Sequence, residues 1–136
     1  MYNALVKGET AQKRSKRILA ELQEKYPEAQ NYDLDGAGTH FVSELEPTKD
    51  HPEYDRAVEV IIRSKPHKHL KTKQRYMVFE GTLELHVGKE VLSLTPGDVY
   101  TIEPGLVHWA RSDNECWLEI YSEPGWTKED HIPVEE

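Results

Sequence analysis

The sequence predicts a mostly β fold, a sandwich or a barrel, that follows one N-terminal helix. Three observations predict it. Apolar residues recur at helical spacing between residues 9 and 27. From residue 57 onward, apolar and polar residues alternate in short runs, as in strands that bury one face. Turn residues separate these runs about every eight to twelve residues, a spacing typical of all-β sandwiches and barrels.

The helix is expected over residues 9–27. Thr10 is a suitable N-cap, and Pro27 ends the helix because proline cannot donate the next backbone hydrogen bond. One face is apolar, with Ile18, Leu19, Leu22 and Tyr26. We interpret the basic run at 13–17 as the solvated face opposite to it. Residues 1–30 are therefore predicted to form an N-terminal helical extension, and residues 31–136 a barrel, within a single domain overall.

Residues 31–56 are mostly loop-like, with one short strand expected at 40–45. Strands are then expected at 58–62, 76–79, 83–87, 91–94, 99–102, 107–111 and 116–121. The Pro- and Glu-rich tail from 122 to 136 is expected to lie over the surface. In the strand at 58–62 the apolar positions are even, whereas the histidines that follow are odd. We therefore expect residues 64–66 to break the alternation, by a bulge or a bend.

Composition excludes several classes of partner. The formal net charge of −8 argues against binding to nucleic acid or to an anionic membrane surface. Cys116 is the only cysteine, so no intrachain disulfide can form, and we interpret it as a buried structural residue. No apolar run approaches the roughly 20 residues of a membrane span. We therefore expect a cytoplasmic protein.

The stretch from 66 to 74, PHKHLKTKQ, is the most informative segment. Residues i and i+2 of a strand point the same way, so His67 and His69 can direct two imidazoles at one point. A lone His-x-His is weak evidence. A second block, 97–108, carries Gly97, Gly105 and His108.

Together the two blocks resemble the paired motifs of the cupin superfamily, G-x5-H-x-H-x(3,4)-E-x6-G and G-x5-P-x-G-x2-H-x3-N. The residues at the required offsets are His67, His69, Gln74 in place of the glutamate, Gly81, Gly97, Gly105 and His108. The resemblance covers about residues 57–122. It is closest to small single-domain cupins of the conserved-barrel, phosphomannose-isomerase-like kind. It implies a double-stranded β-helix (jelly-roll barrel) that holds one divalent metal ion, Zn, Ni, Mn or Fe, through His67, His69, Gln74 and His108.

Four positions depart from the family pattern. Ile61, Glu103 and Ser112 replace residues that shape loops. Gln74 replaces a ligating glutamate, so a bound metal would keep its full +2 charge and would have no ligand carboxylate to act as a base. We interpret His40, His51, His86 and His131 as non-ligands, because they lie out of phase or in loop-like or terminal sequence.

Strand parity suggests further site residues. Tyr76 shares a face with Gln74 and is a candidate substrate-binding residue. Trp117, Glu119 and Tyr121 share one face of the last strand. If that face points into the barrel, Glu119 is the candidate catalytic base and the two aromatic residues contact substrate. The alternative is that all three point to solvent or to a partner subunit.

The resemblance suggests a metal-dependent isomerase or epimerase that acts on a small polar substrate, a sugar or sugar acid. Two alternatives stay open: a three-histidine Fe(II) dioxygenase, and a small-molecule-binding cupin without turnover. Cupins usually pair, and an open sheet edge needs covering, so a homodimer is expected unless the N-terminal helix covers that edge.

Overall fold

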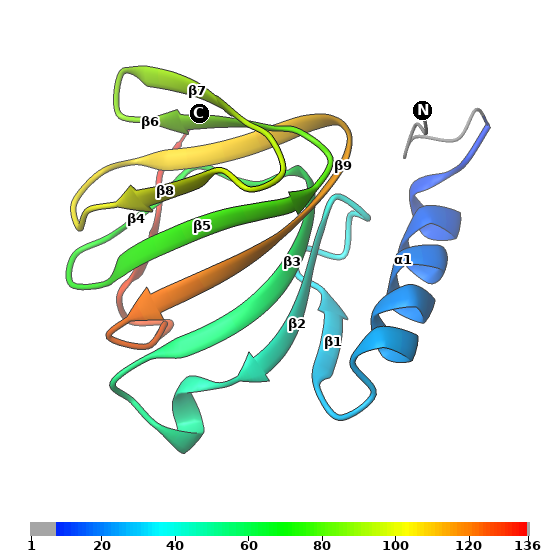
Figure 1. Cartoon of the computed structure of the whole chain (residues 1–136), viewed down its shortest axis with the longest axis horizontal. Helices are drawn as coiled ribbons and strands as arrows, with labels where there is room; N and C mark the ends of the chain where they lie inside the picture. The colour runs from blue at the N-terminus through cyan, green and yellow to red at the C-terminus, as the bar shows by residue number, and fades with distance from the viewer. Residues whose placement is uncertain (1–7, 136) are drawn as a thin grey trace.

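The computed structural model describes residues 8–135 and confirms a mostly β fold with one N-terminal helix (Figure 1). Helix α1 spans Ala11–Lys25, and the side-chain oxygen of Thr10 caps it by accepting a hydrogen bond from the backbone N–H of Lys13. Residues 1–7 of the predicted extension lie outside the described residues. Within the described part of the chain, no helix is long and apolar enough to cross a membrane.

Ten strands follow the helix in one antiparallel sheet. They are β1 (Gln30–Asp33), β2 (His40–Glu46), β3 (Asp55–Arg63), β4 (His67–His69), β5 (Lys73–Glu80), β6 (Leu83–Val87), β7 (Glu90–Leu94), β8 (Val99–Ile102), β9 (His108–Glu123) and β10 (His131–Pro133). A short 3-10 helix, Thr48–Asp50, precedes β3. The sequence pattern missed β1, and it missed β10 in the tail.

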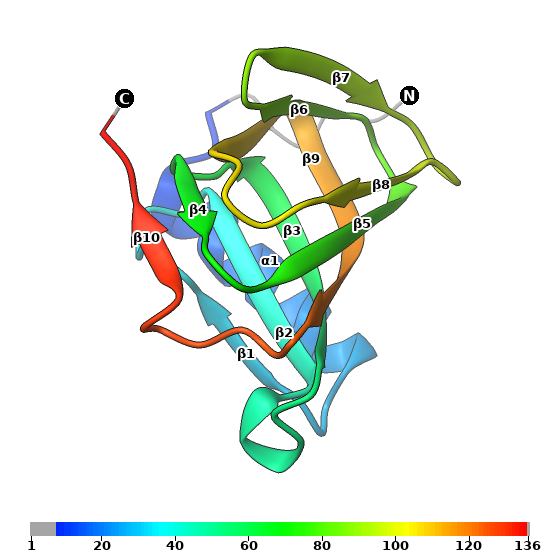
Figure 2. The same cartoon turned by 90° about the vertical axis from the view of Figure 1, so that its left-hand side faces the viewer.

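Strand β9 organises the sheet, because its 16 residues pair with four other strands. Its first residues pair with β6 and, at His108, with His67 of β4. Its second half lies between β3 and β5. The sheet therefore curls into a half-barrel, with α1 outside the β1–β2–β3 wall (Figure 1) and β10 beside β4 (Figure 2).

Two apolar cores lie on opposite faces of this curled sheet. The inner core fills the barrel and includes Ile61, Val78, Leu85, Leu118 and Ile120. The outer core lies between the sheet and α1 and consists of Ile18, Leu22, Phe41, Val58, Val60, Ile62 and Trp117. Cys116 is buried in the inner core, as expected, and its burial raises the pKa of the thiol to about 12.

Strand β3 contributes alternately to the two cores. Its even apolar positions face α1, whereas Ala57, Glu59 and Ile61 face the barrel interior. The break at 64–66 is expected only if the even residues of this strand face the barrel interior. That assignment is wrong: the odd residues face the interior, as His67 and His69 do, so no change of alternation is needed. The strand still ends at Arg63, and its pairing with β9 shifts register between Ile61 and Arg63.

Candidate metal centre

Three histidines from two strands meet inside the barrel. His67 and His69 are two residues apart on β4 and point to the same side, and His108 opens β9 directly across from His67. One ring nitrogen from each of the three lies within 4.8 Å of the others. All three side chains are buried. Among the described residues this is the one group of histidines, cysteines and carboxylates that could hold a metal ion.

Backbone carbonyls fix the tautomers of two of these rings. The Nδ1–H of His67 donates to the carbonyl of Lys65 at 2.9 Å, and the Nδ1–H of His108 donates to that of Leu106 at 3.0 Å. The Nε2 atom of each ring therefore carries the lone pair, which is how metal-binding histidines are usually held. The Nε2 of His108 and both ring nitrogens of His69 are buried without a hydrogen-bond partner in the described structure.

Burial keeps the three imidazoles uncharged near neutral pH. It lowers the pKa of His67 to about 2, with a further contribution from His108, and it lowers the pKa of His69 to about 4. The pKa of His108 is also lowered by burial. Neutral imidazoles are the form that binds metal ions, so these rings need not lose a proton to do so.

Gln74 offers a fourth donor from β5. Its side-chain Nε2 donates to the hydroxyl of Ser122 at 3.0 Å, which sets the orientation of the amide. Its Oε1 is then left buried without a partner in the described structure, although buried polar atoms are nearly always hydrogen-bonded. The three neutral ring nitrogens could hold one metal ion, and such a set suits several transition metals. The unpaired Oε1 makes Gln74 the candidate for a fourth donor.

A cavity of about 530 Å³ reaches this cluster. Its lining includes residues from β1, β2 and β3 and from the C-terminal segment, together with His67, Gln74, Tyr76, Ile120 and Ser122. Tyr76, expected to bind substrate, therefore lines the same cavity as two of the candidate ligands. Burial raises the pKa of its phenol, so the hydroxyl stays protonated and can donate a hydrogen bond.

The structure does not bring Trp117, Glu119 and Tyr121 to this cavity. Trp117 is buried beneath α1 in the outer core. Glu119 pairs in register with Val58 on the same outer face, and its carboxylate accepts a hydrogen bond from Arg56 at 2.7 Å. Tyr121 stacks on Tyr54 with 5.5 Å between ring centroids. The inward face of this part of β9 is formed by Leu118, Ile120 and Ser122.

Three residues near the cluster were not expected at the site. His131 pairs with His69 across β10 and β4, and its ring stacks on His67 with 4.5 Å between centroids. His40 and Glu59 line the cavity as a hydrogen-bonded pair. Glu59 could have been predicted at the site, because its odd position in the strand matches that of His67. Nothing in the sequence indicates His131, because only the pairing of β10 with β4 brings it close.

The C-terminal segment also holds the loop between the candidate ligands His69 and Gln74. The carboxylate of Asp130 accepts hydrogen bonds from the backbone N–H groups of Leu70, Lys71 and Thr72 at 3.0–3.1 Å. Burial alone would raise the pKa of Asp130, but these donors outweigh it and lower the pKa.

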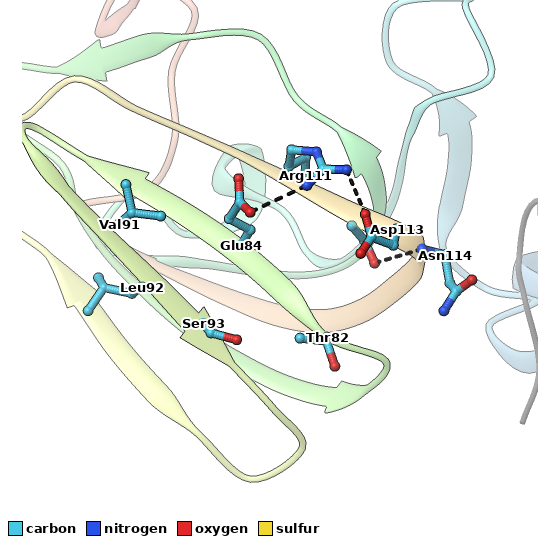
Figure 3. Close-up of a pocket in the computed structure, with 9 residues that line it drawn as sticks. Thr82, Glu84, Val91, Leu92, Ser93, Arg111, Asp113 and Asn114 are labelled. Carbon is cyan, nitrogen blue, oxygen red and sulfur yellow. Dashed lines mark hydrogen bonds and ion pairs between the residues drawn. The ribbon is translucent and has the colours of Figure 1, made fainter.

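A second hollow lies on the outside of the barrel, between β6, β7 and the start of β9 (Figure 3). Its one arginine, Arg111, is already paired with Glu84 at 3.3 Å and with Asp113 at 2.6 Å. Nearby, His86 stacks on Trp109 with 3.9 Å between ring centroids. This hollow contains none of the three clustered histidines, and we assign it no role in the metal centre.

Comparison with known proteins agrees with the fold. Residues 60–121 match the cupin domain family, Cupin_2. None of the curated proteins matches the chain in sequence. The nucleoside dehydratase Pac13 of Streptomyces has a similar structure, with a TM-score of 0.66 and 13% identity over 79% of this chain and 86% of that one. KdgF from Halomonas sp. has a TM-score of 0.64 and 18% identity over 77% of this chain and 94% of that one. Ectoine synthase from P. lautus has a TM-score of 0.58 and 21% identity over 71% and 77%. At these low sequence identities, the structural similarity shows a shared fold and nothing about function.

Proposed function

Because this chain is a cupin-domain protein, we propose that it binds one divalent metal ion and isomerises or epimerises a small sugar or sugar acid. His67, His69 and His108 hold the ion, with Gln74 as the fourth ligand. One observation carries the proposal: the ring nitrogens of three buried histidines lie within 4.8 Å of one another, and His67 of this cluster lines a cavity together with Gln74, whose Oε1 is buried without a partner in the described structure.

A divalent ion held by four neutral donors would keep its full charge and would act as a Lewis acid toward a carbonyl or hydroxyl oxygen. The protein supplies the surroundings. A cavity of about 530 Å³ suits a small molecule. Tyr76 can donate a hydrogen bond to a substrate oxygen, and the half-exposed ring of Trp126 offers an apolar surface at the cavity wall.

The character of the cavity wall supports a polar, oxygen-rich substrate. Carboxylates and hydroxyls from β1, β2 and β3 line it, and hydrogen bonds already hold several of them, such as Tyr32 to Glu44 at 2.7 Å. A few polar groups of this kind can fix the orientation of a substrate that carries hydroxyls. One protein of similar fold, Pac13, is a nucleoside dehydratase whose structures include uridine, so the fold can enclose a small polar molecule.

A three-histidine Fe(II) dioxygenase is the second candidate, and the neutral imidazole set favours it. Oxygen consumption by protein loaded anaerobically with Fe(II) distinguishes the two. Uptake above that of the His69→Ala variant supports the dioxygenase. The isomerase predicts no uptake and activity with a redox-inactive ion such as Zn²⁺.

The proposed reaction is tested by incubating metal-loaded protein with a panel of aldoses, ketoses and uronates and recording NMR spectra over time. We expect the isomer or epimer of at least one compound to form, and none to form with His69→Ala. His86→Ala is the matched control, because His86 lies outside the cluster, and it should behave as wild type. Wild-type protein that alters no compound contradicts the reaction, and ligand binding without change indicates a binding protein.

A further inference from the structure

A carboxylate and an imidazole form a close pair in the wall of the candidate substrate cavity. Glu59 of β3 and His40 of β2 both line this cavity, and the Nε2 of His40 lies 2.6 Å from the Oε1 of Glu59. Building on the proposed function, we propose that Glu59 is the catalytic base that removes and returns the substrate proton, and that His40 is its positioning residue.

The contacts of the pair decide which group faces the substrate. His40 is buried, 6% exposed, and its Nδ1 has no partner among the described residues. That nitrogen is itself buried, so it presents almost no surface to the cavity. Glu59 uses only Oε1 in its bond to His40, and within the described structure its Oε2 makes no hydrogen bond. The carboxylate is therefore held at one oxygen and can act through the other.

Glu59 lines the same cavity as the candidate ligands His67 and Gln74 and as Tyr76. On β3 it lies in register with Leu118 of β9, whose side chain belongs to the inner core. A proton acceptor must lie within reach of the substrate atom that the metal centre activates. A small substrate in this shared cavity can contact the metal centre and Glu59 together.

Three other carboxylates of the cavity are committed to fixed donors, and a fourth, Asp35, pairs with Lys65 at 3.8 Å. Glu44 accepts the hydroxyl of Tyr32, and Glu46 accepts hydrogen bonds from Tyr54 and Arg56. Asp55 accepts the backbone N–H of Trp126 and the hydroxyl of Thr48 through one oxygen. These bonds tie together the loops around the cavity. Glu59 has a single partner, which is itself titratable.

The proposed step is balanced without an oxidant or a reductant. The C–H bond next to the substrate carbonyl breaks, its proton passes to Oε2 of Glu59, and its electron pair moves to give the enolate. Glu59 then returns the proton to the neighbouring carbon on the same face, while a hydroxyl proton passes between the two adjacent oxygens. The carbonyl has moved by one carbon, and the carboxylate is regenerated. A single base suffices for this isomerisation.

The test compares Glu59→Gln, His40→Gln and the exposed control Glu80→Gln with wild-type protein, using a sugar that the wild type converts. Metal content and thermal unfolding are measured for each, and conversion is followed by NMR in D2O. We expect Glu59→Gln to keep its metal, to lose about 10²- to 10⁴-fold in turnover, and to stop incorporating deuterium at the carbon next to the carbonyl. His40→Gln should lower kcat on the order of 10-fold with little change in KM, because it only misplaces the carboxylate.

The outcomes separate this inference from the proposed function. If the Glu59→Gln protein is folded, binds its metal and keeps turnover within about threefold of wild type, Glu59 is not the catalytic base, whereas the proposed reaction is unaffected. Wild-type protein that converts none of the sugars overturns the reaction and this inference together. Equal losses of kcat in the Glu80→Gln control would also overturn the assignment, because the effect would not be specific to the cavity.

Discussion

The side chains of the paired strands β3 and β9 alternate between two faces of the sheet, and the two faces have different roles. The outer face carries the larger apolar side chains, including Trp117, and α1 covers it. The inner face mixes Ile61 and Leu118 with polar residues such as Glu59 and Ser122, and it lines the core and the cavity. Both faces also carry charged residues, since Arg56 and Glu119 lie on the outer one. The face that packs on α1 is the structural one, and the face that lines the cavity leads to the metal centre.

This difference explains why strand parity misled at two places. Alternation shows that a strand has two faces, but it does not say which face closes inside the barrel when both are buried. On β3 the even residues contact α1, and on β9 the odd residues do so. Glu119 is expected beside the metal only if the odd residues of β9 face the barrel interior, whereas they face outward. If the two faces have separate roles, a change on one face should leave the other unaffected.

The largest expected effect is on the outer face. Trp117→Ala should lower the free energy of unfolding by about 3–5 kcal/mol, because it opens a cavity between the sheet and α1. The affinity for metal should stay within about threefold of wild type at temperatures where the variant is folded. Urea unfolding and a metal titration measure the two quantities. A large loss of metal affinity in folded protein would show that the faces are coupled.

The inner face should give metal-free protein a marked pH dependence. The unfolded chain takes up protons at His67 and His69 near their ordinary pKa of about 6.5, whereas the folded state holds these values at about 2 and about 4. As pH falls from 6.5 to 5, only the unfolded state gains protons at these groups, so stability falls. The slope for each histidine rises from about half of 1.4 kcal/mol per pH unit at pH 6.5 toward about 1.4 near pH 5.

Urea unfolding of metal-free protein at several pH values between 5 and 6.5 measures this slope. His69→Gln should make it shallower by about one histidine's contribution. A stability that is flat across this range would contradict the neutral state of the buried rings.

Asp130→Asn should weaken metal binding by about 10- to 100-fold, the usual range for groups that orient metal ligands. The carboxylate holds three consecutive backbone N–H groups between His69 and Gln74, and an amide offers them only one acceptor oxygen. The absorption spectrum of Co²⁺-loaded protein should change with the affinity. Asp113→Asn is the exposed control. Unchanged affinity and spectrum in Asp130→Asn would show that the loop holds its shape without this anchor.

The smallest expected effect is that of Glu119→Gln. Its carboxylate accepts a hydrogen bond from Arg56 on the outer face, so the change should cost less than about 1 kcal/mol of stability and leave turnover within about threefold of wild type. NMR conversion assays beside Glu59→Gln measure this contrast. A loss with Glu119→Gln as large as that with Glu59→Gln would reverse the assignment of the two faces.

Local signals predicted much of the fold and the heart of the site. The helix and most strands follow from spacing and turn residues, and His67, His69 and His108 follow from the paired motifs. Gln74 is more informative in the structure than in the sequence, since its bond to Ser122 leaves Oε1 unpaired.

The remaining site residues depend on tertiary pairing. His131 reaches the site because β10 pairs with β4, and the three-residue length of β10 gives no detectable pattern. His40 and Glu59 come from neighbouring strands, and their contact depends on the register of β2 against β3. Such register is set by the whole sheet, and a single strand does not encode it.

The central claim is that His67, His69 and His108 hold one metal ion. Elemental analysis and a metal titration of wild-type protein, His69→Ala and His86→Ala test it most directly. We expect one divalent ion per chain in wild type and His86→Ala, and loss of that ion in His69→Ala with the fold retained. Equal metal content in His69→Ala and wild type, or no ion bound by wild type at any tested metal, would contradict it.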